Sequence, residues 1–131
     1  MTRFLAGLLA LLAAANGLVM LLAGRWWYGA VPGVSETGPF NPHFVEDIGA
    51  AFLTVAIGFA WLAARGSAAG RGAALAGAAF LGLHGLIHIA GAFTDPHGLA
   101  DLERDFAGVV VPALVALWIA WPQSSRGESN A

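Results

Sequence analysis

The sequence predicts an all-α integral membrane protein, folded as a four-helix bundle. Of its 131 residues, 58% are hydrophobic and only 11% are charged, whereas about a quarter of the residues of a soluble domain are charged. A soluble chain this short has too much surface for so few polar groups to cover. The hydrophobic residues also gather in four runs, and a helix satisfies its own backbone hydrogen bonds in lipid.

The four predicted spans cover residues 4–24, 43–64, 73–93 and 105–121, within a membrane domain of residues 1–122. A helix needs about 20 residues to cross the hydrocarbon core. The first run resembles a signal peptide, but it continues to Ala23, so we expect it to be retained as a span. The second helix is expected to begin with Asn41 as N-cap and Pro42 in its first turn. Residues 123–131 are polar, and we expect a disordered tail there.

The placement of arginine predicts that both termini are cytoplasmic. Arg3, Arg65, Arg71 and Arg126 lie at the two termini and in the loop between spans two and three, where Glu128 is the only acid. We therefore expect a multi-pass protein in the lipid bilayer of a bacterial cytoplasmic (inner) membrane. Six arginines, no lysine and a net charge of −2 leave no basic patch for nucleic acid.

An internal repeat is suggested by two similar segments. Residues 16–20 (Asn-Gly-Leu-Val-Met) resemble residues 84–88 (His-Gly-Leu-Ile-His), and Ala-Gly follows both. Such a repeat predicts two helical hairpins related by an axis along the membrane normal, and it places Asn16 and Met20 opposite His84 and His88. Because Ala, Gly and Leu are frequent in this chain, a chance match is the alternative.

Polar side chains at membrane depth are the most informative residues, because they are costly in lipid and usually face protein. His84 and His88 are one helical turn apart, on a helix face that holds Leu81 and five small residues, namely Ala74, Gly77, Gly85, Gly91 and Ala92. The opposite face carries large apolar residues, namely Leu75, Phe80, Leu83, Leu86, Ile87 and Phe93. Since small residues mark packing faces of membrane helices, both histidines are expected to point into the bundle.

A metal site is the leading functional hypothesis. Two imidazoles one turn apart can bind one ion, and His43 and Asp47 are expected to complete the ligand set from the second span. An N/O set of this kind suits zinc, copper or iron. Further ligands or orienting groups for this site are Glu46, Asn16, Met20 and His97.

Several alternatives remain open. The polar core can be purely structural, with His84 bonded to Asn16 or a backbone carbonyl and Asp47 paired with His43 or Arg104. The protein would then be a homo-oligomer or an accessory subunit of a larger membrane complex, with a redox complex as one alternative. Haem, a quinone head group and a proton pathway are further alternatives, and whether the chain is an enzyme stays open. The absence of cysteine excludes disulfides and thiolate metal sites.

The opening of the second span, Phe-Asn-Pro-His-Phe-Val-Glu-Asp-Ile-Gly at residues 40–49, resembles small bacterial four-helix membrane proteins grouped as DoxX-like. The similarity in hydropathy covers nearly the whole chain. This resemblance implies a four-helix integral membrane fold and an association with membrane redox systems. It assigns no catalytic residue.

Overall fold

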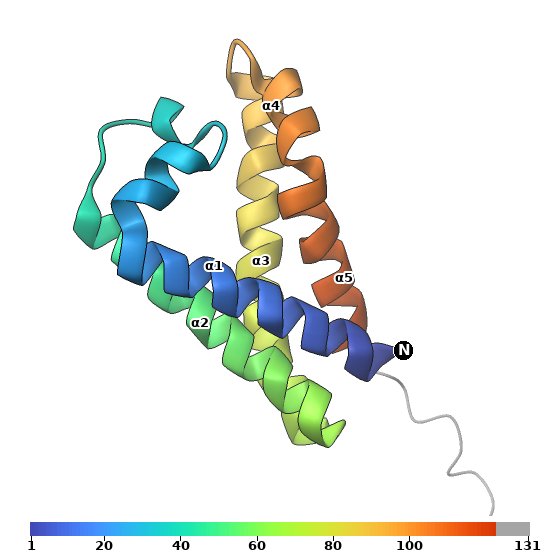
Figure 1. Ribbon diagram of the computed structural model, residues 1–131. Coiled ribbons are helices and arrows are strands. Elements are labelled where there is room, and N and C mark those ends of the chain that lie inside the picture. Colours follow the sequence, from blue (N-terminus) through green and yellow to red (C-terminus); the bar gives the residue numbers. More distant parts are fainter. Residues whose placement is uncertain (123–131) are drawn as a thin grey trace, which may run out of the picture.

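The computed structural model describes residues 1–122, which are helical and contain no strand. Its elements are α1 (Thr2–Ala30), the 3-10 turn η1 (Val34–Glu36), α2 (Pro42–Arg65), α3 (Ala68–Thr94), α4 (Gly98–Asp105), the π-helical turn η2 (Phe106–Val110) and α5 (Val111–Ala120). Figure 1 shows their order along the chain. The predicted disordered tail, residues 123–131, lies outside the described residues.

Three helices, α1, α2 and α3, are long and apolar enough to cross a membrane. This finding indicates a membrane protein and confirms the all-α prediction for the described residues. The fourth predicted span corresponds to η2, which has 5 residues, followed by α5, which has 10 residues. That length is below the roughly 17 residues that a span ordinarily needs, so the count of four spans stays a prediction.

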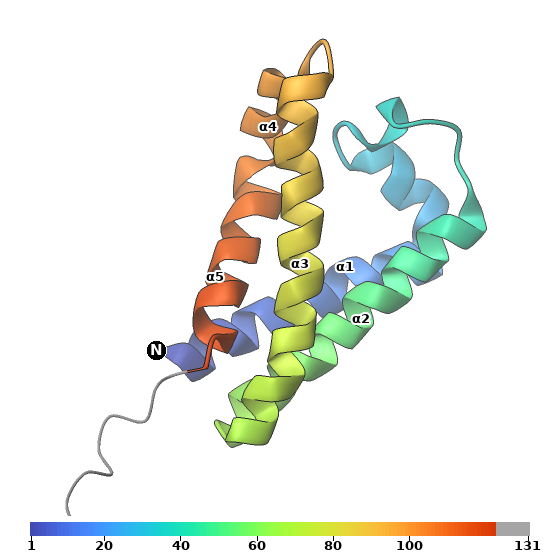
Figure 2. The ribbon, with the colours of Figure 1, turned by 180° about the vertical axis from the view of Figure 1, so that it is seen from behind.

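The helices form two hairpins that cross each other (Figures 1 and 2). In the first hairpin α1 packs along α2, and in the second α3 packs against α5. The start of α1 lies beside the end of α5, so that the hairpins meet there. The buried core gathers at this end, from Ala6, Leu9, Ala10, Val55, Phe59, Leu62, Ala74, Ala78, Ala116 and Ile119 among others.

Glycines allow α1 and α2 to approach closely. A Cβ atom built on Gly17 would lie 2.7 Å from the carbonyl oxygen of Gly49, and one built on Gly49 would lie 3.0 Å from that of Gly17. Both distances are shorter than ordinary contacts, so no larger residue fits without a shift. Small residues at the crossing thus supply the close backbone packing that is typical of membrane helices.

The small-residue face of α3 is buried as the sequence predicts, including Ala74, Gly77, Leu81, Gly85 and Ala92. The large apolar residues Leu83, Leu86, Ile87 and Phe93 are exposed, which suits contact with lipid. The prediction was wrong for Phe80. Its ring packs against the buried core and lies edge-on to Phe52 of α2, with 5.5 Å between ring centroids. Because α2 crosses α3 obliquely, it covers a wider sector of α3 than the small residues alone.

Two arginines cap helix ends where the hairpins meet. Arg3 donates hydrogen bonds of 2.7 Å to the carbonyl oxygens of both Ala63 and Ala64 in the last turn of α2. Arg71 donates to the carbonyl oxygen of Ile119 in the last turn of α5, at 3.4 Å. The last carbonyls of a helix have no partner within the helix, and cations are favourable there. These arginines therefore tie α1 to α2 and α3 to α5.

At the opposite end, α1 bends at Ala23, whose φ of −144° and ψ of 40° are not helical. The last turns of α1 hold the following loop through Tyr28, whose hydroxyl donates to the carbonyl oxygens of Ser35 and Gly38. The ring of Phe40 lies edge-on to Tyr28, with 5.3 Å between centroids. The loop from Val31 to Asn41 is therefore folded back onto α1.

The start of α2 is as predicted. Asn41 precedes the helix in an extended conformation, and its side-chain oxygen accepts a 3.2 Å hydrogen bond from the backbone N–H of Phe44. Pro42 occupies the first turn, where a missing N–H has no cost.

Candidate functional site

The two histidines of α3 lie side by side, with 4.8 Å between their ring centroids and 75° between the ring planes. The His84 ring is parallel to that of Phe80 and edge-on to that of Phe52, at 6.2 Å in both cases. Within residues 1–122, no side chain or carbonyl forms a hydrogen bond with His84. Its ring nitrogens are therefore available to a ligand.

His88 is held by a carboxylate. Its Nδ1–H donates a 2.9 Å hydrogen bond to Oδ2 of Asp105, and the two side chains are only 28% and 15% exposed. Because the carboxylate occupies Nδ1, the Nε2 atom of His88 is the one left for another partner. The bond also joins α3 to the end of α4.

Arg104 holds the other oxygen of this carboxylate. Its Nε donates to Oδ1 of Asp105 at 2.9 Å. Burial by itself would raise the pKa of Asp105, but the hydrogen bonds from Arg104 and His88, together with the charge of Arg104, outweigh burial and hold that pKa below its usual value. The hydrogen bond to Asp105 likewise raises the pKa of Arg104, with the nearby carboxylates adding to the effect. Asp105 is thus an anion in this cluster at neutral pH.

Arg104 also links α4 to the loop after α1. Its Nη1 lies 2.8 Å from Oδ1 of Asp101 and 3.7 Å from Oε2 of Glu36. The guanidinium packs against Gly33, where φ is +81° and a Cβ atom would overlap it. The ionic cluster formed by Glu36, Asp101, Arg104 and Asp105 therefore spans both hairpins.

A tight turn brings α4 back against α3. The backbone N–H of Gly98 donates to the carbonyl oxygen of Asp95 at 3.1 Å, and the Asp-Pro-His-Gly sequence of residues 95–98 has the residue types that turns favour. Gly98 is buried, and a Cβ atom on it would lie 2.6 Å from the Cα atom of Ala92. This close approach lets the polar helix α4 run back along α3, so that Asp105 reaches His88.

The other two predicted metal ligands lie elsewhere. His43 and Asp47 form a pair in the first turns of α2, with 3.6 Å between Nδ1 and Oδ2, and their side chains are 85% and 66% exposed. In the part of the chain that the structure describes, no group of three or more His, Asp or Glu side chains is placed to hold a metal ion. The structure therefore brings His84 and His88 together but does not bring His43 and Asp47 to them. The expectation of convergence assumed upright helices, whereas the hairpins cross and the start of α2 diverges from α3 (Figure 2).

The predicted orienting groups are also engaged elsewhere. The side-chain oxygen of Asn16 accepts a 2.9 Å hydrogen bond from Nε1 of Trp27, and its amide lies 3.6 Å from the sulfur of the buried Met20. This bond bridges the bend in α1. His97 is exposed at the start of α4, and Glu46 is exposed on α2.

Sequence reasoning missed the residues that surround the histidines, above all Asp105 and Phe52. The turn at residues 95–98 and the polar helix after it were the available signals. A helix that doubles back after such a turn places acidic residues near the end of the preceding helix.

Comparison with protein-family models, with characterised proteins and with solved structures found no match to this chain.

Proposed function

We propose that this protein is a small membrane protein that binds a metal ion at His84 and His88. The supporting observation is the pair of adjacent imidazoles, 4.8 Å apart between ring centroids, of which one is fixed by a carboxylate. Imidazole is a ligand for zinc, copper and iron. Histidine ligands commonly donate the second ring N–H to a carboxylate, which sets the tautomer and the ring orientation. The bond between His88 and Asp105 has this form.

The proposed site is open. Two imidazoles leave coordination positions for water or a solute, and metal centres with free positions are the ones that activate bound molecules. The rings of Phe52 and Phe80 beside His84 provide an apolar wall on one side of the proposed site. His43 and Asp47 do not belong to this revised ligand set.

The second candidate is an accessory subunit of a larger membrane complex, with a hydrogen-bonded polar core and no metal. The ionic cluster favours it, because Arg104 already satisfies Asp105 and joins α4 to the loop of the first hairpin without any ion. The DoxX-like resemblance and its redox association belong to this candidate as well.

The proposal includes a bacterial cytoplasmic membrane with both termini inside. Arg3 and Arg71 lie at the end where the hairpins meet, and Arg65 ends α2 there. Arginines concentrated at one end follow the positive-inside pattern. Labelling of single cysteines introduced at the two ends, in intact cells, would test this orientation.

Metal content separates the two candidate functions. The protein would be purified without a histidine tag or chelator, and its metal would be measured by inorganic mass spectrometry. We expect near-stoichiometric metal in the wild type and none in the His84→Ala/His88→Ala double variant. The matched control is His43→Ala/His97→Ala, which removes two exposed histidines and should retain the metal.

Two outcomes would contradict the metal site. One is wild-type protein without metal, after reconstitution with zinc, copper(I) and iron(II) in turn. The other is metal that is lost equally from both double variants. Either result would leave the accessory subunit as the supported function.

A further inference from the structure

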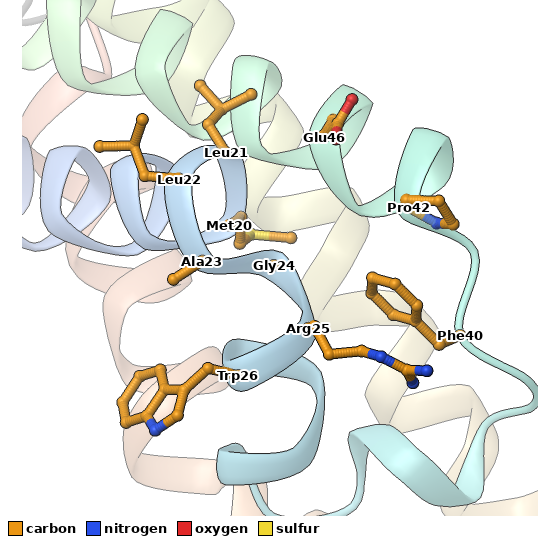
Figure 3. Close-up of a pocket in the computed structure, with 10 residues that line it drawn as sticks. All are labelled: Met20, Leu21, Leu22, Ala23, Gly24, Arg25, Trp26, Phe40, Pro42 and Glu46. Atoms are coloured by element: carbon orange, nitrogen blue, oxygen red, sulfur yellow. The ribbon is translucent and has the colours of Figure 1, made fainter.

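A groove of about 550 Å³ lies at the bend of α1, away from the histidines. Residues 20–26 of α1 form one side of it, and Phe40, Pro42 and Glu46 form the other. Figure 3 shows these side chains around the bent segment, with the start of α2 facing α1. The groove shares no residue with the proposed metal site, so the two can be tested separately.

The groove lies where the regular helix of α1 is broken. At Ala23 the helical dihedral angles are interrupted, and neither proline nor a π-turn accounts for the bend. Irregular backbone at membrane depth is tolerated where protein covers it or where it lines a polar cavity. The groove lies at this interruption of α1.

The groove also presents two separate charges. The guanidinium carbon of Arg25 lies 4.9 Å above the ring centroid of Phe40, a contact with the ring face that leaves N–H groups free at the edge of the guanidinium. Among residues 1–122, neither Arg25 nor Glu46 has an ion-pair partner, and the two are not paired with each other. A cation on α1 and an anion on α2 therefore flank one groove without neutralising each other.

The surroundings place this groove at the level of lipid head groups. Trp26, Trp27 and Tyr28 follow Arg25 directly, and tryptophan and tyrosine gather at the membrane–water interface. Leu21 and Leu22 line the side of the groove that continues along the apolar part of α1. The groove is therefore lined by both charged and apolar side chains.

We propose that this groove binds the head group of a zwitterionic phospholipid that carries a primary ammonium, as in phosphatidylethanolamine. The phosphate lies on Arg25, whose planar guanidinium suits phosphate oxygens. The ammonium lies on Glu46, and the acyl chains run along Leu21 and Leu22. A primary ammonium donates hydrogen bonds to a carboxylate, which a quaternary ammonium cannot do.

Lipid retention measured by native mass spectrometry tests the proposal. The wild-type protein would be mixed with equal amounts of phosphatidylethanolamine, phosphatidylcholine and phosphatidylglycerol with identical acyl chains. We expect a preference of about fivefold for phosphatidylethanolamine over the other two, the size of one good ion pair near a surface. Glu46→Gln should abolish this preference, and Glu46→Lys should shift it towards phosphatidylglycerol. The control Glu103→Gln, an exposed acid on α4, should leave it unchanged.

The phosphate contact has its own pair of variants. Arg25→Gln should reduce retention of all three lipids, whereas Arg65→Gln, at the far end of α2, should not. Soluble phosphoethanolamine at the same concentration should not displace the lipid, because it lacks acyl chains.

Three results would overturn the proposal: equal retention of the three lipids by the wild type, an unchanged preference in Glu46→Gln, or full displacement by soluble phosphoethanolamine. The last result would identify the ligand as a dissolved zwitterion. Since all these variants keep His84 and His88, failure here leaves the metal proposal untouched.

Discussion

Asp105→Asn tests the link between α3 and α4, because it keeps the shape of the side chain and removes its charge. In the structure Oδ2 of Asp105 accepts from His88 and Oδ1 accepts from Arg104, both at 2.9 Å. Asparagine has only one oxygen, so its NH₂ group must face one of the two partners. If the NH₂ group faces Arg104, its N–H groups meet the N–H donor of the guanidinium and no hydrogen bond forms. Facing His88, it meets another donor unless the imidazole shifts its proton from Nδ1 to Nε2, after which Nδ1 accepts a weaker hydrogen bond between neutral groups.

The cost of the milder outcome follows from hydrogen-bond strengths. A hydrogen bond to a charged group contributes about 1.5–3 kcal/mol to stability, and a neutral one about 0.5–1.5 kcal/mol. Because Asp105 is only 15% exposed, solvent does not remove much of this difference. We therefore expect Asp105→Asn to lower the free energy of unfolding by about 1–2 kcal/mol.

Unfolding in mixed micelles of a mild detergent and dodecyl sulfate, followed by tryptophan fluorescence and circular dichroism, would measure this loss. Hydrogen exchange should show that protection falls mainly in residues 98–110. Glu103→Gln is the matched control, since Glu103 is exposed two residues away, and it should stay within about 0.5 kcal/mol of the wild type. Equal stability of the two variants would refute the role given to Asp105.

Three further results are expected. The pKa of Asp105 is lowered in the folded state, so its stabilisation is complete above the unfolded value of about 3.9 and is lost as pH falls through the folded value. The difference in unfolding free energy between the wild type and Asp105→Asn should therefore be largest at neutral pH and shrink as the pH falls below about 4. Gly17→Ala should destabilise the fold by about 1–3 kcal/mol, because its Cβ atom would lie 2.7 Å from the carbonyl oxygen of Gly49. Gly72→Ala, which has open space around it, should instead stabilise α3 by about 0.5–1 kcal/mol. The same unfolding assay measures both variants, and equal effects would contradict the close packing. Arg3→Gln should increase hydrogen exchange in the last turn of α2, whose carbonyls Arg3 caps, and unchanged exchange would count against that cap.

Local patterns were enough to predict much of the chain. The apolar composition and the long runs predicted helices of membrane type, and Asn41 with Pro42 predicted the start of α2. The adjacency of His84 and His88 follows from helical periodicity alone, because residues four apart on one helix share a face. Such features depend on neighbours in sequence, and the printed sequence contains all of them.

The partners of those histidines depended on how the helices cross. The crossing is set by which surfaces fit, such as Gly17 against Gly49, and this contact joins residues more than thirty positions apart. The oblique crossing partly buries Phe80, and it separates His43 from the α3 histidines. The periodicity of a single helix carries no information on the angle at which a second helix packs against it.

What the sequence by itself determined is therefore the apolar helices, the start of α2 and the histidine pair. The tertiary structure alone decided that His88 is held by Asp105, that Arg104 joins the two hairpins, and that α1 bends at Ala23 beside a charged groove. The physical reason is that helix formation is governed by short-range hydrogen bonds and side-chain periodicity. The pairing of polar groups between helices depends instead on the packing of whole surfaces.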